Sequence, residues 1–395
     1  MDTLFDYIDK FANENFYDRP YNAVDALVFS QFAYIEFEKC FAFDTRLLIS
    51  DIWRKITENV SDAEFRTFSS LMQKSILLLS HAAMTARYQN VLVSGYKNII
   101  SNEDEKQFSA TCFKTRTGEC VLAFRGTDET LAGLKESAML SFTFPVFSQK
   151  ASAEYLRYFL EEHFEKVHLT GHSKGGNLAV YAAVQNVKKA ERVLDIYNFD
   201  GPGFQESFVQ SAGYDRINEK ITTILPEGSI VGQLFCHDEK ILVVESDKSG
   251  LSQHHAFNWY IRGDDFIYAN EPQYVSTLFE KTINDLFENV SRDKIEEVFE
   301  SLFSILDATG AETLDDLKRL RPDKLKALWK AIENADKNDR GYLKEIFSLL
   351  IHYGFVNALP DMRAELADWR KEIELALTKH FKLPEQKNAD DYEHP

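Results

Sequence analysis

The stretch from Lys166 to Ala183, KVHLTGHSKGGNLAVYAA, limits the fold of this chain more than any other. It has the pattern of a β-strand, then G-x-S-x-G, then a helix rich in small residues. A serine between strand and helix lies on a sharp turn, where Gly171 and Gly175 remove side chains that would collide. The first helical turn also offers N–H groups and partial positive charge where an oxyanion would form. The pattern predicts a nucleophile elbow with Ser173 as the nucleophile, and the alternative is a purely structural turn.

Strands and helices alternate on both sides of this turn. Short β-rich runs fall between residues 91 and 270, and helical patterns separate several of them, notably Ala153–Phe164 and Asn177–Val187. This alternation predicts the α/β class, with a mainly parallel sheet covered by helices on both faces. The β-rich runs are Val91–Ile100, Gln107–Lys114, Glu119–Phe124, Lys166–Thr170, Val193–Phe199, Ile221–Leu225 and Ile241–Val244.

The regions before and after the alternating part have helical patterns. We therefore expect three parts: a helical N-terminal region at 1–90 packed on the core, the α/β core at 91–270, and a helical C-terminal segment at 271–395. The clearest helical patterns are Ala23–Phe41, Phe65–Met84, Tyr274–Asn289 and Lys294–Asp307. The polar end, Gln386–Pro395, is expected to fray.

Composition and charge exclude several classes of function. The formal charge of −18 repels nucleic-acid phosphates and anionic lipid headgroups. The first residues are acidic where a secretory signal would be basic, and no apolar stretch is long enough to span a bilayer. Cys40, Cys112, Cys120 and Cys236 lack metal-binding spacing. We therefore expect a cytoplasmic protein with reduced thiols, no nucleic-acid partner and no transmembrane segment.

A second motif, Phe124-Arg-Gly-Thr127, follows the strand pattern Glu119–Phe124. Together with G-H-S-x-G-G it resembles the class 3 lipase family of α/β-hydrolases, and more closely a bacterial family of unknown function related to those lipases. The resemblance extends over roughly residues 20–270 and implies an α/β-hydrolase fold. It also implies that Thr127 supplies one oxyanion donor beside the N–H of Lys174, whose side chain we expect in solvent. The alternative is a tight turn with a buried ion pair.

A serine nucleophile needs a base, and the base needs an orienting carboxylate. The resemblance maps the catalytic histidine onto His254, in a loop after the Ile241–Val244 run. His255 is a competitor, because His255 and Ala256 replace the Asp-Pro expected next in the related family.

The acid is predicted to be Asp200. It ends the strand pattern Val193–Phe199, at the carboxyl edge where α/β sites are built. Its context, D-G-P-G-F, resembles the acid loop of pancreatic-type lipases. Class 3 lipases carry the acid one strand later, where this chain has Ser229. This departure favours Asp200 and leaves Glu227 and Asp238 as alternatives.

Apolar residues gather between Leu131 and Lys150, where class 3 lipases carry their lid. We expect a lid or an acyl-binding wall there, and the alternative is a core-packing loop. The residues are Met139, Leu140, Phe142, Phe144 and Phe147.

These features predict a serine hydrolase that cleaves carboxylic esters of an apolar acyl substrate through an acyl-enzyme. The partner is a small-molecule ester or lipid. No cofactor is needed, and no metal is expected because the histidines near residues 237 and 254 lack metal-binding spacing. Two other functions are compatible with the motifs: acyl transfer to an alcohol or thiol, and a non-catalytic or regulatory binding module on a hydrolase fold.

Overall fold

The computed structural model describes residues 2–43, 46–101, 106–127, 135, 140, 143–162, 166–248, 250–269, 292–310, 322–336 and 339–343. The chain divides into two compact units, Met1–Ile295 and Glu296–Pro395. The N-terminal helical region, expected at 1–90, lies in the same unit as the sheet.

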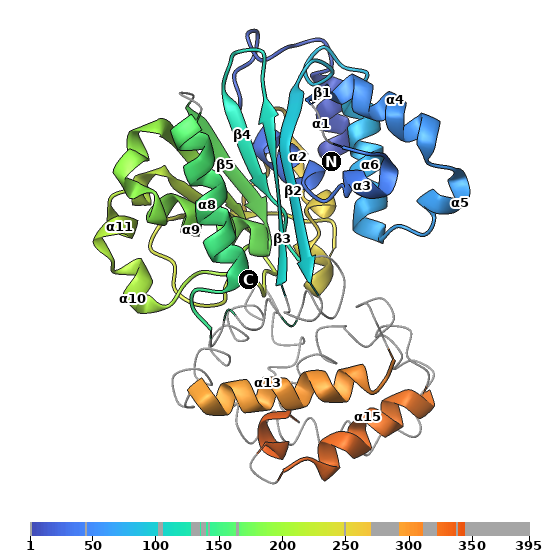
Figure 1. Ribbon diagram of the computed structural model, residues 1–395, viewed down its shortest axis with the longest axis vertical. Helices are drawn as coiled ribbons and strands as arrows, with labels where there is room; N and C mark the ends of the chain where they lie inside the picture. The colour runs from blue at the N-terminus through green and yellow to red at the C-terminus, as the bar shows by residue number, and fades with distance from the viewer. Residues whose placement is uncertain are drawn as a thin grey trace, which may run out of the picture. The chain divides into compact units, whose positions relative to one another are not determined.

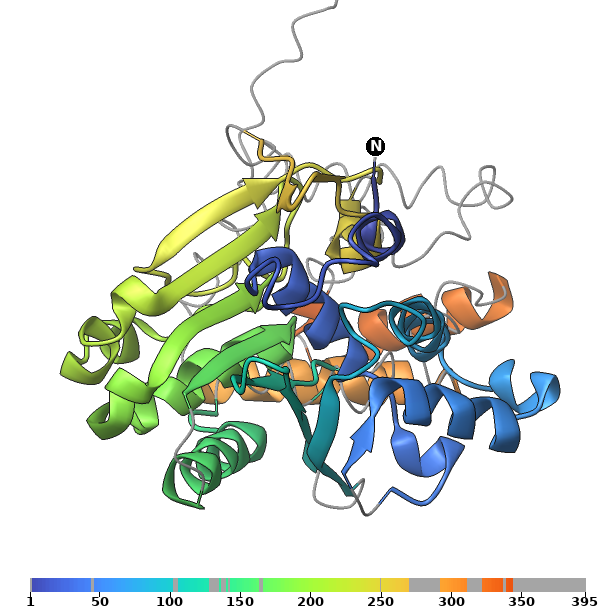
Figure 2. The same cartoon turned by 90° about the horizontal axis from the view of Figure 1, so that it is seen from above.

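An eight-stranded sheet, with its strands in chain order, forms the centre of the first unit. The strands are β1 (Leu47–Leu48), β2 (Leu92–Ser101), β3 (Lys106–Lys114), β4 (Cys120–Phe124), β5 (Val167–His172), β6 (Val193–Phe199), β7 (Ile221–Pro226) and β8 (Lys240–Val244). Neighbours from β1 to β4 pair antiparallel, and neighbours from β4 to β8 pair parallel. The carboxyl ends of β4 to β8 therefore lie along one edge of the sheet, which twists as Figure 2 shows.

Helices cover both faces of this sheet (Figure 1). The alternation along β4 shows how: Val121 and Ala123 pack with α1 (Leu4–Lys10), α2 (Ala23–Phe32) and α6 (Ser70–Ala82). Leu122 and Phe124 pack instead with α8 (Phe147–Glu162) and α9 (Lys174–Gln185). Because successive side chains of a strand point to opposite faces, a strand buried on both sides is apolar throughout. The predicted α/β class, with a mainly parallel sheet covered by helices on both faces, is confirmed.

Several boundaries differ from the predicted ones. The pattern Ala23–Phe41 is not one helix, because α2 ends at Phe32 and the short α3 (Phe37–Cys40) follows. The N-terminal region also contributes strand β1, which its helical pattern did not predict. The other short elements of this unit are α4 (Ile49–Asn59), α5 (Asp62–Phe65), α10 (Glu206–Val209), α11 (Ala212–Asp215), β9 (Ile261–Arg262), β10 (Asp265–Phe266) and the 3-10 turns Val187–Arg192, Asn218–Lys220, Gly250–His254 and Ala256–Asn258.

A buried ion pair joins the N-terminal helices to the residues that lead into β2. Asp25, in the first turn of α2, accepts from Arg87 through Nε (2.9 Å) and Nη2 (2.5 Å). The hydroxyls of Tyr88 and Tyr7 donate to the same carboxylate. Both charged side chains are fully buried, so each depends on the other for compensation.

The helices described from residue 292 onward are α13 (Arg292–Asp307) and α15 (Pro322–Asn334). Each buries an apolar stripe at helical spacing, including Val298, Leu302 and Leu306 in α13 and Leu328 and Ile332 in α15. The predicted helix Tyr274–Asn289 and the polar end Gln386–Pro395 lie outside the described residues. None of the described helices is both long and apolar enough to cross a bilayer.

Candidate active site

Ser173 lies between the end of β5 and the start of α9, in the strained conformation of a nucleophile elbow. Its φ of 58° and ψ of −134° are rare for a residue with a side chain. The two flanking glycines are required by close approach rather than by their own torsions. A Cβ on Gly171 would lie 2.2 Å from the carbonyl of Gly175, and one on Gly175 would lie 2.1 Å from the Phe124 oxygen. The turn thus brings α9 into direct contact with the backbone of β4 and β5.

Asp200 follows β6 at the same edge and is fully buried. It also has a left-handed backbone, with φ of 51°. Its carboxylate oxygen Oδ2 lies 2.6 Å from Nδ1 of His254. The other oxygen, Oδ1, accepts from the Ser229 hydroxyl and from the Gly232 N–H at 3.2 Å. The contact expected between Asp200 and the His254 ring is therefore present.

Ser229 is a site residue whose role the sequence did not reveal. It occupies the position where class 3 lipases carry their acid, and here its hydroxyl donates to Asp200 instead. The serine found at the position expected for an acid thus forms a hydrogen bond to the predicted acid after the neighbouring strand. The signal was present in the sequence, as a hydroxyl residue at a position where an acid was expected.

His254 is fixed through its neighbours as well as through its ring. The indole N–H of Trp259 donates to the Gln253 carbonyl at 2.7 Å, and the Gly228 N–H donates to the Gln253 side chain at 2.8 Å. Because an ionised carboxylate can only accept, Nδ1 carries the hydrogen of this contact. The side chain of His254 is 23% exposed, so the ring borders solvent. Among the described residues the Ser173 hydroxyl makes no hydrogen bond with this ring.

The loop after β4 lies against the elbow. A Cβ on Gly126 would be 3.1 Å from the Cβ of Ser173, and Thr127 is the next residue. Lys174 is the first residue of α9, where the N–H of a helix has no acceptor within the helix itself. Thr127 and Lys174 thus belong to segments that flank Ser173, and their role as oxyanion donors stays a prediction.

The prediction that the Lys174 side chain projects into solvent is wrong. The side chain is 1% exposed, and its ammonium donates to the backbone and side-chain oxygens of Gln107, both at 3.2 Å. Because α9 lies so close to the sheet, its first side chain reaches β3 instead of water. A charge placed there has polar partners within the protein.

The buried ion pair considered for the Arg125 loop is also present. Arg125 donates to the Asn98 side chain at 3.0 Å, and its Nη1 lies 3.8 Å from Glu36. This arrangement holds the loop from the side of β2. The ion-pair alternative therefore describes part of this loop, and the role of Thr127 stays a prediction.

Asp238 and His237 have hydrogen-bond partners other than His254. Asp238 accepts from the Asn218 side chain at 2.9 Å, and His237 lies 2.7 Å from Glu239. Burial opposes the charge of Glu239, but the hydrogen bond and charge of His237, together with hydrogen bonds from Thr223 and Tyr214, outweigh it and lower the pKa of the carboxyl to about 2. The N–H of His255 donates to the Ser252 carbonyl at 3.4 Å. Nδ1 of His254 is held by Asp200 and not by Glu227 or Asp238.

The predicted lid or acyl wall is described only in part, because Met139 and Phe142 lie outside the described residues. Leu140 is buried. The Phe144 ring packs against Phe208 (5.0 Å between centroids) and also contacts Tyr181 and Phe204. The first residue of α8, Phe147, packs on the same apolar cluster. The described aromatic rings of this segment thus contribute to the core.

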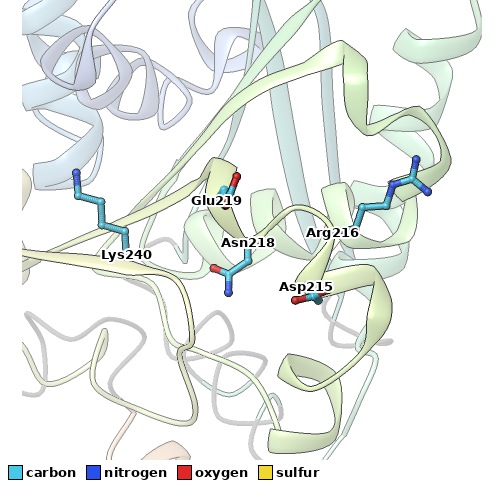
Figure 3. Close-up of a pocket in the computed structure, with 5 residues that line it drawn as sticks. All are labelled: Asp215, Arg216, Asn218, Glu219 and Lys240. Carbon is cyan, nitrogen blue, oxygen red and sulfur yellow. The ribbon is translucent and has the colours of Figure 1, made fainter.

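One polar hollow lies away from the predicted site residues. A hollow lined by Asp215, Arg216, Asn218, Glu219 and Lys240 contains none of the predicted site residues (Figure 3). This hollow lies at the amino ends of β7 and β8, because Asn218–Lys220 precede β7 and Lys240 begins β8. It is therefore away from the edge that carries Ser173. Across the described ranges, no three His, Cys, Asp or Glu side chains are grouped as metal ligands.

Solved structures of lipases resemble this chain weakly. Rhizomucor miehei lipase in its propeptide complex is 17% identical with a TM-score of 0.28, and the match covers 39% of this chain and 57% of that one. M37 lipase is 18% identical with a TM-score of 0.34, covering 53% and 68%. Rhizopus microsporus var. chinensis lipase is 12% identical with a TM-score of 0.34, covering 66% and 84%. At this level the likeness says nothing about what the chain cleaves.

A family model described as Mbeg1-like matches residues 82–304, which is more than half of the chain. No curated protein matches this chain.

Proposed function

The chain belongs to the Mbeg1-like family, and we propose that it is a serine hydrolase that cleaves carboxylic esters of an apolar acyl group. The observation that carries this proposal is the 2.6 Å contact between Asp200 and Nδ1 of His254. It lies at the same sheet edge as the strained turn of Ser173. A histidine with its Nδ1 hydrogen bonded to a buried carboxylate has the tautomer that a general base requires.

In the proposed reaction, the Ser173 hydroxyl attacks the ester carbonyl carbon while Nε2 of His254 takes its proton. The carbonyl oxygen becomes an oxyanion, which accepts from the N–H groups of Thr127 and Lys174. Each such donor contributes roughly 3 kcal/mol of transition-state stabilisation. His254 then gives the proton to the leaving alcohol as the C–O bond breaks, and the acyl group stays on Ser173.

Hydrolysis of the acyl-enzyme by water completes the proposed cycle through the same kind of proton transfer. His254 takes a proton from the water as its oxygen attacks the acyl carbon, and Ser173 recovers its proton when the tetrahedral intermediate collapses. Asp200 stays ionised throughout and stabilises the imidazolium that forms twice in each cycle. Every proton in this scheme moves between the substrate, water and two side chains, so no cofactor is needed.

The preference for an apolar acyl group is supported by the residues from Leu140 to Phe147. Leu140, Phe144, Val146 and Phe147 are its described apolar members. Phe144 and Phe147 pack on the face of the sheet that also carries α8 and α9. In this proposal Leu140, Phe144 and Phe147 form part of a wall beside the elbow, and the predicted members Met139 and Phe142 lie outside the described residues. A small-molecule ester or a lipid is the proposed substrate, and the proposed location is the cytoplasm, supported by four cysteines that form no disulfide.

The test is hydrolysis of a p-nitrophenyl ester series from acetate to palmitate by the full chain. We expect the kcat/KM to rise with acyl length and the Ser173→Ala variant to lose activity at every length. Ser75→Ala is the matched control, because Ser75 is also buried and its hydroxyl has no hydrogen-bond partner among the described residues. A folded wild type without activity on any ester would contradict the proposal. Turnover only after addition of an alcohol or thiol would indicate acyl transfer instead.

A further inference from the structure

Two buried side chains link the elbow to the backbone of His254. The residue before the nucleophile is His172, whose Nε2 lies 2.7 Å from the carbonyl oxygen of His254. Its Nδ1 lies 3.0 Å from the hydroxyl of Tyr34. A carbonyl can only accept, so Nε2 carries the hydrogen, and Nδ1 accepts from Tyr34. Both hydrogen bonds are satisfied by one neutral tautomer.

The surroundings of His172 keep it neutral. Burial lowers its pKa well below the ordinary value of 6.5, and the nearby rings of His254 and His255 act in the same direction. The centroids of the His172 and His254 rings lie 4.7 Å apart. A proton on His172 would therefore oppose the imidazolium that the proposed reaction forms on His254.

Tyr34 also lies against the loop after β4. It follows α2 and is 4% exposed. A Cβ on Gly126 would lie 2.2 Å from the Tyr34 hydroxyl oxygen, so this hydroxyl lies directly against the loop that leads to Thr127. The same hydroxyl is 3.4 Å from the His172 carbonyl. Tyr34 thus contacts the Arg125–Thr127 loop, the elbow and the ring that holds His254.

We infer that Tyr34 and His172 form a positioning pair that holds the His254 backbone and the Arg125–Thr127 loop in register with Ser173. This inference rests on the proposed function. Neither side chain is expected to contact substrate. Tyr34 comes from the N-terminal helical region, outside the residues 82–304 that the family model matches. That region therefore contributes to the site and does more than cover the sheet.

The pair is proposed to act by fixing the distance between His254 and Ser173. His254 must keep its ring on Asp200 while Nε2 approaches Ser173, and a displacement of about 1 Å costs about 100-fold in rate. The His172 bond to the His254 carbonyl fixes the backbone of that residue independently of its ring. Removing the bond also leaves a buried carbonyl without this donor, which favours a shifted backbone.

The test compares substitutions that keep or remove each hydrogen bond, measured as kcat and KM on one p-nitrophenyl ester. His172→Phe keeps a ring and removes both bonds, and we expect kcat to fall about 10- to 100-fold with KM nearly unchanged. His172→Gln retains an N–H donor and is expected to recover most of the loss. Tyr34→Phe is expected to lower kcat by about 10-fold.

Tyr21→Phe is the matched control, since it also removes a buried tyrosine hydroxyl from the N-terminal region but next to His168, not His172. Melting temperatures are measured alongside, because a merely structural role would make the loss of rate follow the loss of stability. Full kcat in His172→Phe and Tyr34→Phe, with an active wild type, would overturn the inference and leave the proposed function intact. If His172→Phe does not fold, Tyr34→Phe and His172→Gln still decide. An inactive but folded wild type would overturn both.

Discussion

At the scale of single residues, the proposed site depends on the contact between Asp200 and Nδ1 of His254, which favours one tautomer of the ring. Asp200→Asn replaces an acceptor-only group by one that can also donate, so the favoured tautomer changes while the shape is kept. We expect turnover to fall by up to ~10⁴-fold with little change in KM or melting temperature. Asp238→Asn is the control, because Asp238 bonds to Asn218 and not to His254. Equal losses in the two variants would contradict the assignment.

His172 also predicts how stability depends on pH. Its pKa is lowered in the folded protein, chiefly by burial, from the ordinary value of 6.5. Below pH 6.5 the unfolded chain binds a proton that the folded chain excludes, so the contribution of this residue to stability is complete above 6.5 and is lost as pH falls below it. We expect the melting temperature of the wild type to fall more steeply than that of His172→Gln between about pH 7.5 and pH 5. Parallel curves would show that His172 takes up its proton without cost.

At the scale of elements, the N-terminal helices depend on the buried pair of Asp25 and Arg87. Asp25→Asn leaves the guanidinium buried without its counter-charge, and we expect a loss of about 3–5 kcal/mol in the free energy of unfolding. The double variant Asp25→Asn with Arg87→Met removes both charges, so its loss should be smaller than the sum of the single losses. Urea denaturation measures all three. A loss below about 1 kcal/mol in Asp25→Asn would mean that the pair contributes as little as an exposed one.

The elements could be predicted from the sequence because their signals are local. The strands that carry the site are apolar runs of the expected length, and the elbow is contained within Gly171–Gly175. The end of α2 was missed because the apolar spacing continues past Phe32 into a separate short helix. Contacts between side chains that are far apart in sequence have no such local pattern. The burial of Lys174 against β3 and the contact between Tyr34 and His172 join residues far apart in sequence, so they required the structure.

At the scale of the whole molecule, the net charge of −18 affects which surfaces the protein can approach. We expect hydrolysis of an insoluble p-nitrophenyl ester to be faster in neutral phospholipid vesicles than in anionic ones at low salt, because like charges repel. The difference should shrink as the Debye length falls to about 10 Å near 0.1 M salt. Equal rates on both vesicles at low salt would mean that the face with the active site does not share the overall charge.

The central claim is that Ser173 is an activated nucleophile, and labelling by a fluorophosphonate probe tests it most directly. The phosphorus of the probe bonds to a nucleophilic serine oxygen and fluoride leaves, so mass spectrometry of the digested protein identifies the labelled residue. We predict the label on Ser173 in the wild type and in His255→Ala, and no label in Ser173→Ala or His254→Ala. A folded wild type that stays unlabelled, or one that carries the label on another residue, would contradict the account.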